Sequence, residues 1–290
     1  MNVVSLQRQF ERIGAELKVE TVEPVEPRWK LSRVQQMALN SGYALDIVEQ
    51  KRTESYQLVV RAEELPRLEA VTMDSQPKQR HLLLMMRTVD EDGEPVGDPS
   101  RFLCGHDERH WFIATPRGNV SNVAQAMESL KPIGLVTRQR RVGVRRKHWN
   151  RRKNAAFLRQ GEWFFLPEPN YQPPAQVAIL HNEPLQRGFG SKPHTIEYLV
   201  RDGGEQVWVC RNYPHGISEL RYRNLINSKP KLKALDWQPM RRNPRVMARG
   251  KVRHADHATI ELPFWHEVQI NREGTMDSSG RISWNIAFLD

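Results

Sequence analysis

Residues 43–60 read YALDIVEQKRTESYQLVV, and this stretch decides the class of fold. Two apolar segments, Tyr43–Val48 and Tyr56–Val60, flank the polar residues Glu49–Glu54. That is the pattern of two strands joined by a turn, and the β-branched and aromatic content of both segments favours strand over helix. The stretch therefore predicts a pair of strands.

The same pattern continues outward along the chain. Further strands are predicted at Leu68–Met73, His81–Arg87, Arg101–Cys104, His110–Ala114, Glu162–Leu166, Gln176–Leu180, Thr195–Val200, Gln206–Cys210, Val246–Val252, Ala258–Leu262 and Glu267–Ile270. Helices are predicted at Ser5–Leu17, Ser121–Leu130 and Ser218–Asn227, and the sequence also allows one over Trp149–Leu158. Because strands and helices do not alternate regularly, we expect an α+β fold with mainly antiparallel sheets, a few short helices and two lobes. The expected divisions are an N-terminal α+β lobe (1–135), a basic connecting segment (136–160) and a C-terminal β-rich lobe (161–290).

Length and composition predict one or two ordered domains. The chain has 290 residues, and its eight Trp and nine Phe residues supply bulky core side chains. The two cysteines cannot build a disulfide framework, and no apolar segment predicts a secretory signal or a membrane span. We therefore expect a reduced, cytoplasmic protein without a membrane partner.

Positive charge is concentrated in two segments. Residues 129–161 carry eleven Lys and Arg residues and no acidic residue, which leaves 33 basic against 34 acidic residues in the rest of the chain. Residues 221–253 hold another eleven basic residues and one acidic residue. A local field of one sign favours a polyanionic partner, because each neutralised phosphate releases counterions. We expect the two segments to form a shared cationic face.

The predicted function is therefore intracellular nucleic-acid binding, with RNA favoured over DNA because Trp and Tyr accompany the arginines and no groove-reading helix motif is present. The segments remain compatible with solvated loops, or with a basic adaptor that docks on an acidic protein. No cofactor is expected. The candidate nucleic-acid-binding residues are Arg138, Arg140, Arg141, Arg145, Arg146, Lys147, Trp149, Arg151, Arg152, Lys153, Arg221, Tyr222, Arg223, Arg241, Arg242, Arg245, Arg249, Lys251 and Arg253.

Histidines near the C-terminus give an alternative, a phosphodiesterase or nuclease-like enzyme that acts on nucleic acid. The catalytic candidates are His254, His257 and His266, because paired imidazoles can move the protons of phosphoester cleavage. The tripeptide from His257 to Thr259 resembles one half of the paired H-x-T signature of 2H phosphoesterases. A second half is missing, because His194 is followed directly by a threonine. We therefore assign no family and leave open whether the protein is an enzyme.

Cys104, His106 and His110 are candidate metal ligands by residue type. Their flanking segments predict strands, on which positions four apart lie about 13 Å from each other. We therefore expect residues 105–109 (GHDER) to form a hairpin turn and expect no metal site.

Overall fold

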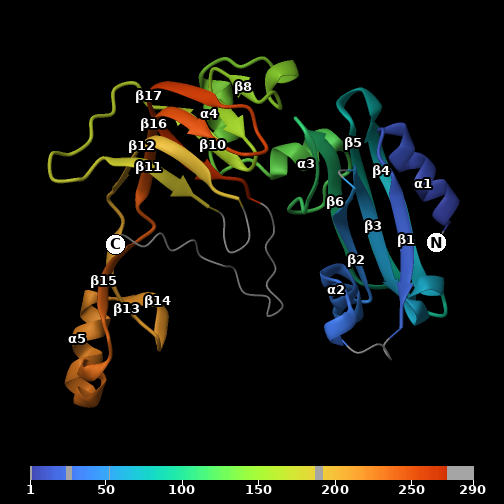
Figure 1. Cartoon of the computed structure of the whole chain (residues 1–290), viewed down its shortest axis with the longest axis horizontal. Coiled ribbons are helices and arrows are strands. Elements are labelled where there is room, and N and C mark those ends of the chain that lie inside the picture. Colours follow the sequence, from blue (N-terminus) through green and yellow to red (C-terminus); the bar gives the residue numbers. More distant parts are fainter. Residues whose placement is uncertain (1, 24–27, 52, 187–191, 273–290) are drawn as a thin grey trace. The chain divides into compact units, whose positions relative to one another are not determined.

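The computed structural model describes residues 2–23, 28–51, 53–186 and 192–272 (Figure 1). Among them, the chain up to Val136 together with Arg272 forms unit 1, and Thr137–Asn271 form unit 2. All strand pairs are antiparallel in this part of the chain except β1 with β3, so the predicted α+β class with mainly antiparallel sheets is confirmed. Almost all of the basic segment 136–160 belongs to unit 2.

Unit 1 contains two sheets and three α-helices in its described part. Its strands are β1 (Leu17–Val22), β2 (Tyr43–Gln50), β3 (Thr53–Arg61), β4 (Leu68–Gln76), β5 (His81–Val89), β6 (Pro95–Asp107) and β7 (His110–Ala114). Its helices are α1 (Val3–Arg12), α2 (Arg33–Ser41) and α3 (Val123–Ser129). The strand orders are β1-β3-β2 and β4-β5-β6-β7.

The two sheets of unit 1 enclose one core. Successive side chains along a strand point to opposite faces, so every second side chain enters this core. Leu82 and Leu84 of β5 point into this core with Phe10 of α1, whereas the intervening Leu83 packs under α3. On the outer face of the three-stranded sheet, α2 packs through Val34 and its neighbours. The layers are therefore helix, sheet, sheet and helix, with α1 closing the central core.

The hairpin predicted from residues 43–60 is confirmed, because Tyr43 of β2 pairs with Val60 of β3. The predicted first helix is shorter than expected: α1 ends at Arg12, and Leu17 begins β1. The helix α2 was not predicted, although it begins with a capping box between Ser32 and Gln35.

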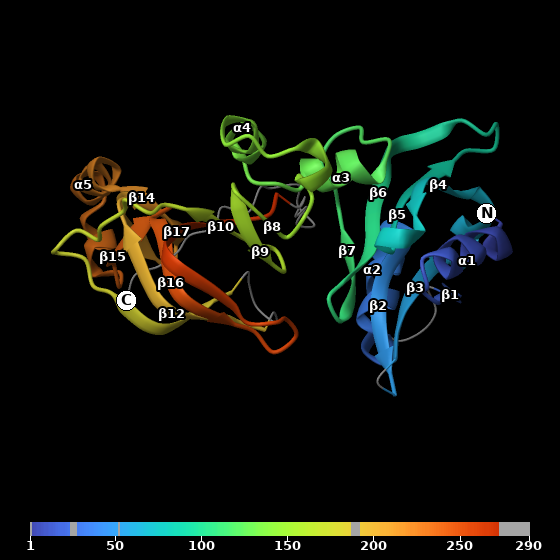
Figure 2. The same cartoon turned by 90° about the horizontal axis from the view of Figure 1, so that it is seen from above.

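Unit 2 contains a seven-stranded sheet in the order β11-β12-β16-β17-β10-β9-β8 and a three-stranded sheet in the order β14-β13-β15. The strands of the larger sheet are β8 (Lys153–Asn154), β9 (Phe157–Gln160), β10 (Trp163–Pro167), β11 (Leu180–Leu185), β12 (His194–Asp202), β16 (Arg245–Arg253) and β17 (Ile260–Ile270). The smaller sheet holds β13 (Glu205–Cys210), β14 (Tyr213–Ser218) and β15 (Gln238–Arg242), and the α-helices are α4 (Leu135–Arg141) and α5 (Glu219–Ser228). Figure 2 shows α5 beside β14, and the helix also packs against β13.

The seven-stranded sheet curls around its own core. Trp163 and Phe165 of β10 pack with Ile196 of β12, although two strands separate β10 from β12 in the sheet order. The curl also brings Gly161, in the turn between β9 and β10, against His194 at the start of β12. Residues far apart in the sheet order thereby meet at one end of the unit.

Several predictions in unit 2 need correction. Trp149–Leu158 is not a helix, because it forms the short strands β8 and β9 after a 3₁₀ turn (Arg146–His148). The strand expected at Gln176–Leu180 begins at Leu180, and the two strands expected after residue 257 are one strand, β17. Among the described residues, no helix is both long enough and apolar enough to cross a membrane.

Candidate nucleic-acid interface and histidine cluster

Within the first basic segment, α4 ends in a Schellman motif. The N–H of Gly143 donates to the Arg140 carbonyl (3.1 Å), and the N–H of Val144 donates to the Gln139 carbonyl (2.9 Å). Gly143 has φ +70°, a left-handed conformation that side chains with a Cβ adopt at a cost. This glycine therefore stops the helix and turns the chain into a loop.

The buried side chain of Trp149 holds this loop in place. It is 5% exposed, and its indole N–H donates to the Val144 carbonyl (2.8 Å). The amide of Gln139, itself buried, donates to the Trp149 carbonyl (2.8 Å). The guanidinium carbons of Arg140 and Arg146 lie 5.7 and 5.4 Å from the ring centroid. Trp149, one of the candidate nucleic-acid-binding residues, therefore packs its ring within the loop and contacts two of the arginines.

Exposed cations surround the anchored tryptophan. We define the basic loop by seven exposed residues, Arg140, Arg141, Arg145, Arg146, Lys147, Arg151 and Lys153. Within the described part of the chain none of the seven forms an ion pair. Arg145, Arg151 and Lys153 line a surface hollow of about 330 Å³, with His148 between them. The sequence placed these charges together, and the structure leaves them without carboxylate partners in that part.

The positive charges of the basic loop affect the pKa of the His148 imidazole. Burial lowers its pKa, and the charges of Arg151, Lys147 and Arg145 lower it further. Its Nδ1 is buried, with no hydrogen-bond partner among the described residues. The protonated form of the His148 ring is therefore disfavoured in a hollow lined by cations.

Two other predicted residues of this segment have contacts of their own. Arg138 is largely buried and forms an ion pair with Glu168 (2.9 Å). Arg152 is half-buried. Neither is part of the basic loop.

The second basic segment is partly neutralised and lies on other elements. Arg223 pairs with Glu219 along α5 (2.7 Å), Arg242 of β15 hydrogen-bonds to Glu205 through its guanidinium Nε (3.2 Å), and Arg245 of β16 lies 3.8 Å from Glu267. Arg249 lies over the rings of Tyr198 and Trp265. Arg241 donates to the Gly203 carbonyl, whereas Arg221, Lys251 and Arg253 are exposed.

Tyr222 packs within the unit. Its ring stacks on Trp208 with centroids 4.5 Å apart and meets Trp237 edge to face. The first segment lies at the β8 end of the larger sheet, whereas the second lies on β16, α5 and β15. A shared cationic face therefore stays a prediction, and the candidate interface is the basic loop, whose seven exposed cations form no ion pair in the described part of the chain.

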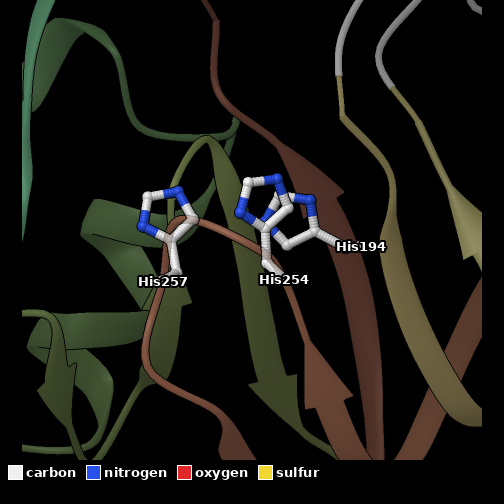
Figure 3. Close-up of side chains that lie close together, drawn as sticks. All are labelled: His194, His254 and His257. Carbon is white, nitrogen blue, oxygen red and sulfur yellow. The ribbon is translucent and has the colours of Figure 1, made fainter. Parts of the chain in front are cut away.

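Three histidines meet at the curled end of the larger sheet: His194 begins β12, and His254 and His257 lie in the segment that connects β16 to β17. Figure 3 shows the ring of His194 behind that of His254, with His257 beside them. The centroids of His194 and His254 are 4.2 Å apart, and those of His254 and His257 are 4.7 Å apart. One ring nitrogen from each residue lies within 4.8 Å of the other two. Strand register explains the first contact, because Thr195 pairs with Arg253 and so places His194 beside His254.

The cluster is buried on the side of His194. That residue is 1% exposed, and neither of its ring nitrogens has a hydrogen-bond partner in the described part of the chain. Burial lowers the pKa of His194 to about 3, helped by the neighbouring His254 and His257. The ring is therefore neutral at ordinary pH, with a lone pair available for a ligand.

The remaining candidates lie elsewhere. His266 is a buried core histidine whose Nδ1 lies 2.8 Å from the Phe264 carbonyl, and it is not part of the cluster. His106 and His110 lie on the two strands of the β6–β7 hairpin, whose turn is shorter than predicted because β6 extends to Asp107 and only Glu108 and Arg109 connect it to β7. His110 contacts Glu54 (2.6 Å), and Cys104 is buried, where desolvation raises its pKa above the usual range. Among the described residues, these three do not form a metal-ligand group.

Comparison with known proteins finds no match to a family model, to a curated protein or to a solved structure. The site is therefore interpreted from its own residues.

Proposed function

We propose that this protein binds nucleic acid through the basic loop, with single-stranded RNA as the favoured partner. The observation that carries the proposal is a set of seven exposed cations without an ion pair in the described part of the chain. An unpaired guanidinium gives up no internal partner when it contacts a phosphate. It can also contact two phosphate oxygens at once.

Preorganisation supports the proposal. Trp149 and Gln139 fix the loop backbone, so that Arg145, Arg151 and Lys153 surround one hollow before any ligand arrives. Binding then orders side chains more than backbone, which lowers its entropic cost.

The shape of the site favours a single strand over the duplex. The helix α4 has seven residues, and the cations lie mainly in the loop that follows it, so the basic loop does not offer a recognition helix to the major groove. Arginine planes can stack on unpaired bases, which a single strand exposes and a duplex hides.

The test compares two variants that each remove three positive charges. R145Q/R151Q/K153Q alters the hollow, whereas K229Q/K231Q/K233Q alters exposed lysines near and within the 3₁₀ turn after α5. Fluorescence anisotropy with a labelled RNA oligonucleotide should show a tenfold or larger loss of affinity for the first variant and little change for the second. Equal losses, or none, would contradict the proposal. Retention of an acidic polypeptide in place of RNA would instead support the adaptor alternative.

One observation favours the enzymatic alternative as a second candidate function. His254 and His257 lie close to His194, and a phosphodiesterase that transfers protons through imidazoles requires such rings to lie close together. The test is the hydrolysis of an activated phosphodiester by wild type and by His257→Ala. Equal rates, or no hydrolysis by wild type, would exclude this function.

A further inference from the structure

The histidine cluster holds buried polar atoms that lack partners among the described residues. Both ring nitrogens of His194 are among them, together with Oε1 of Gln160 and Nε1 of Trp163. The ring of Trp163 meets that of His194 edge to face, and the Gln160 amide donates to the carbonyl of Ala258, next to His257. Buried polar atoms are nearly always hydrogen-bonded, so such a gathering at one place points to a missing ligand.

We propose that His194, His254 and His257 form a binding site for a divalent transition-metal ion of the zinc class. Neutral imidazole nitrogens are strong ligands for Zn²⁺ and Co²⁺, and three of them are the protein ligands of one known class of zinc site. A cation bound here would give a partner to a buried ring nitrogen of His194, neither of whose nitrogens has one among the described residues. The site is independent of the basic loop, none of whose seven residues is a ligand.

The distances allow this assignment after a small movement. Zinc bonds of 2.0–2.1 Å in tetrahedral geometry place two nitrogen ligands about 3.4 Å apart. The ring nitrogens now lie within 4.8 Å of one another, so they must approach by at most about 1.4 Å. The lone pair of each nitrogen lies in the plane of its ring, and the planes of His194 and His257 are 25° apart, so metal binding also requires the stacked rings to turn toward a common point.

Gly161 marks where the donors converge. A Cβ on this residue would lie 2.9 Å from Nε2 of His257 and 3.5 Å from Nε2 of His194. Two imidazole nitrogens therefore face one small space that any larger residue would fill. Gly161 also has φ +57°, a conformation that residues with a Cβ rarely adopt, so glycine is favoured at this position.

Metal-binding histidines commonly donate a hydrogen bond from the ring nitrogen that does not bind the metal, and His254 has an acceptor for such a bond. Its Nε2 lies 3.3 Å from the Lys192 carbonyl, so an N–H there can donate to that oxygen and leave Nδ1 for the metal. The Asp256 N–H, which now lies 3.1 Å from Nδ1 of His254, would lose this hydrogen bond when a metal binds there. The carboxylate of Asp256 is held by Lys192 (2.7 Å), which leaves the fourth metal position to an exchangeable ligand such as water.

The experiment titrates Co²⁺ into the full chain, without an affinity tag and stripped of metal by EDTA, and follows the visible absorption of the ion. We expect one Co²⁺ per chain with the spectrum of a tetrahedral site, displaced by one equivalent of Zn²⁺. His254→Ala and His257→Ala should each weaken binding at least about 100-fold. Both residues are half-buried, so these variants are safer for folding than one at His194, and circular dichroism verifies their structure.

Two controls make the result specific. His215→Ala removes an exposed histidine outside the cluster and should bind like wild type. Gly161→Ala should weaken binding, whereas Gly203→Ala, with a similar φ of +64° and no described atom within 4 Å of where its Cβ would lie, should not. No saturable binding, or wild-type affinity in both His254→Ala and His257→Ala, would overturn the site. Equal affinities of the two glycine variants would overturn the position of the metal beside Gly161.

Discussion

Removing three cations from the basic loop should change how RNA binding depends on salt. For a single strand, the slope of log K against log salt is about −0.7 for each neutralised phosphate. If all seven cations contact phosphates, the slope is about −5, and between 50 and 200 mM salt the affinity falls about 900-fold. R145Q/R151Q/K153Q leaves four cations and a slope of about −3, so that its affinity falls only about 50-fold over the same range.

The assay is fluorescence anisotropy of a labelled RNA oligonucleotide at five or more salt concentrations. K229Q/K231Q/K233Q carries the same net charge as the loop variant, so it measures the effect of overall charge alone. Its slope should match that of wild type. The reasoning fails if the loop variant keeps the wild-type slope, or if the two triple variants lower it equally.

Three further predictions concern the loop and unit 1. Trp149→Ala should lower the free energy of unfolding by about 3–5 kcal/mol and weaken RNA binding although no charge is lost. Trp149→Phe loses only the indole N–H and should lower it by about 1 kcal/mol. Urea unfolding measures both values, and equal values would contradict the anchoring role. The pKa of His148 should lie below its usual value in the free protein and rise on RNA binding, because phosphate favours the charged ring; an unchanged pKa by NMR titration would place the nucleic acid elsewhere. Burial lowers the pKa of Lys131 to about 8, so between pH 8 and 10.5 the unfolded chain binds more protons than the folded protein. The free energy of unfolding should therefore rise by about 1.4 kcal/mol per pH unit in this range. Lys131→Met should remove this rise, and a rise that persists in the variant would refute the assignment.

The α+β class could be predicted because the strand pattern is local. The hairpin of residues 43–60 shows both strands and their turn in eighteen consecutive residues. The helix α2 was missed although its capping box, Ser32 with Gln35, stands in the sequence. The helix allowed over Trp149–Leu158 was wrong for a non-local reason: Gln139 and Val144 bond the tryptophan from outside that segment.

The candidate sites divide in the same way. The sequence shows where arginines cluster, but it does not show which of them form ion pairs, because that depends on which elements pack together. Arg242, for example, contacts Glu205 because their two strands pair. His254 and His257 were recognised as candidates because they lie three residues apart. His194 was considered only as a missing motif half, since it is 60 residues away and joins them through the register of β12 with β16.

The most direct test of the nucleic-acid proposal is a map of the contacts themselves. Ultraviolet crosslinking of the full chain to single-stranded RNA, followed by mass spectrometry of its peptides, reports which residues touch the nucleic acid. We predict that the adducts lie mainly between Arg140 and Lys153 and disappear in R145Q/R151Q/K153Q. Adducts confined to α5, β15 and β16, or unchanged in this variant, would contradict the proposal.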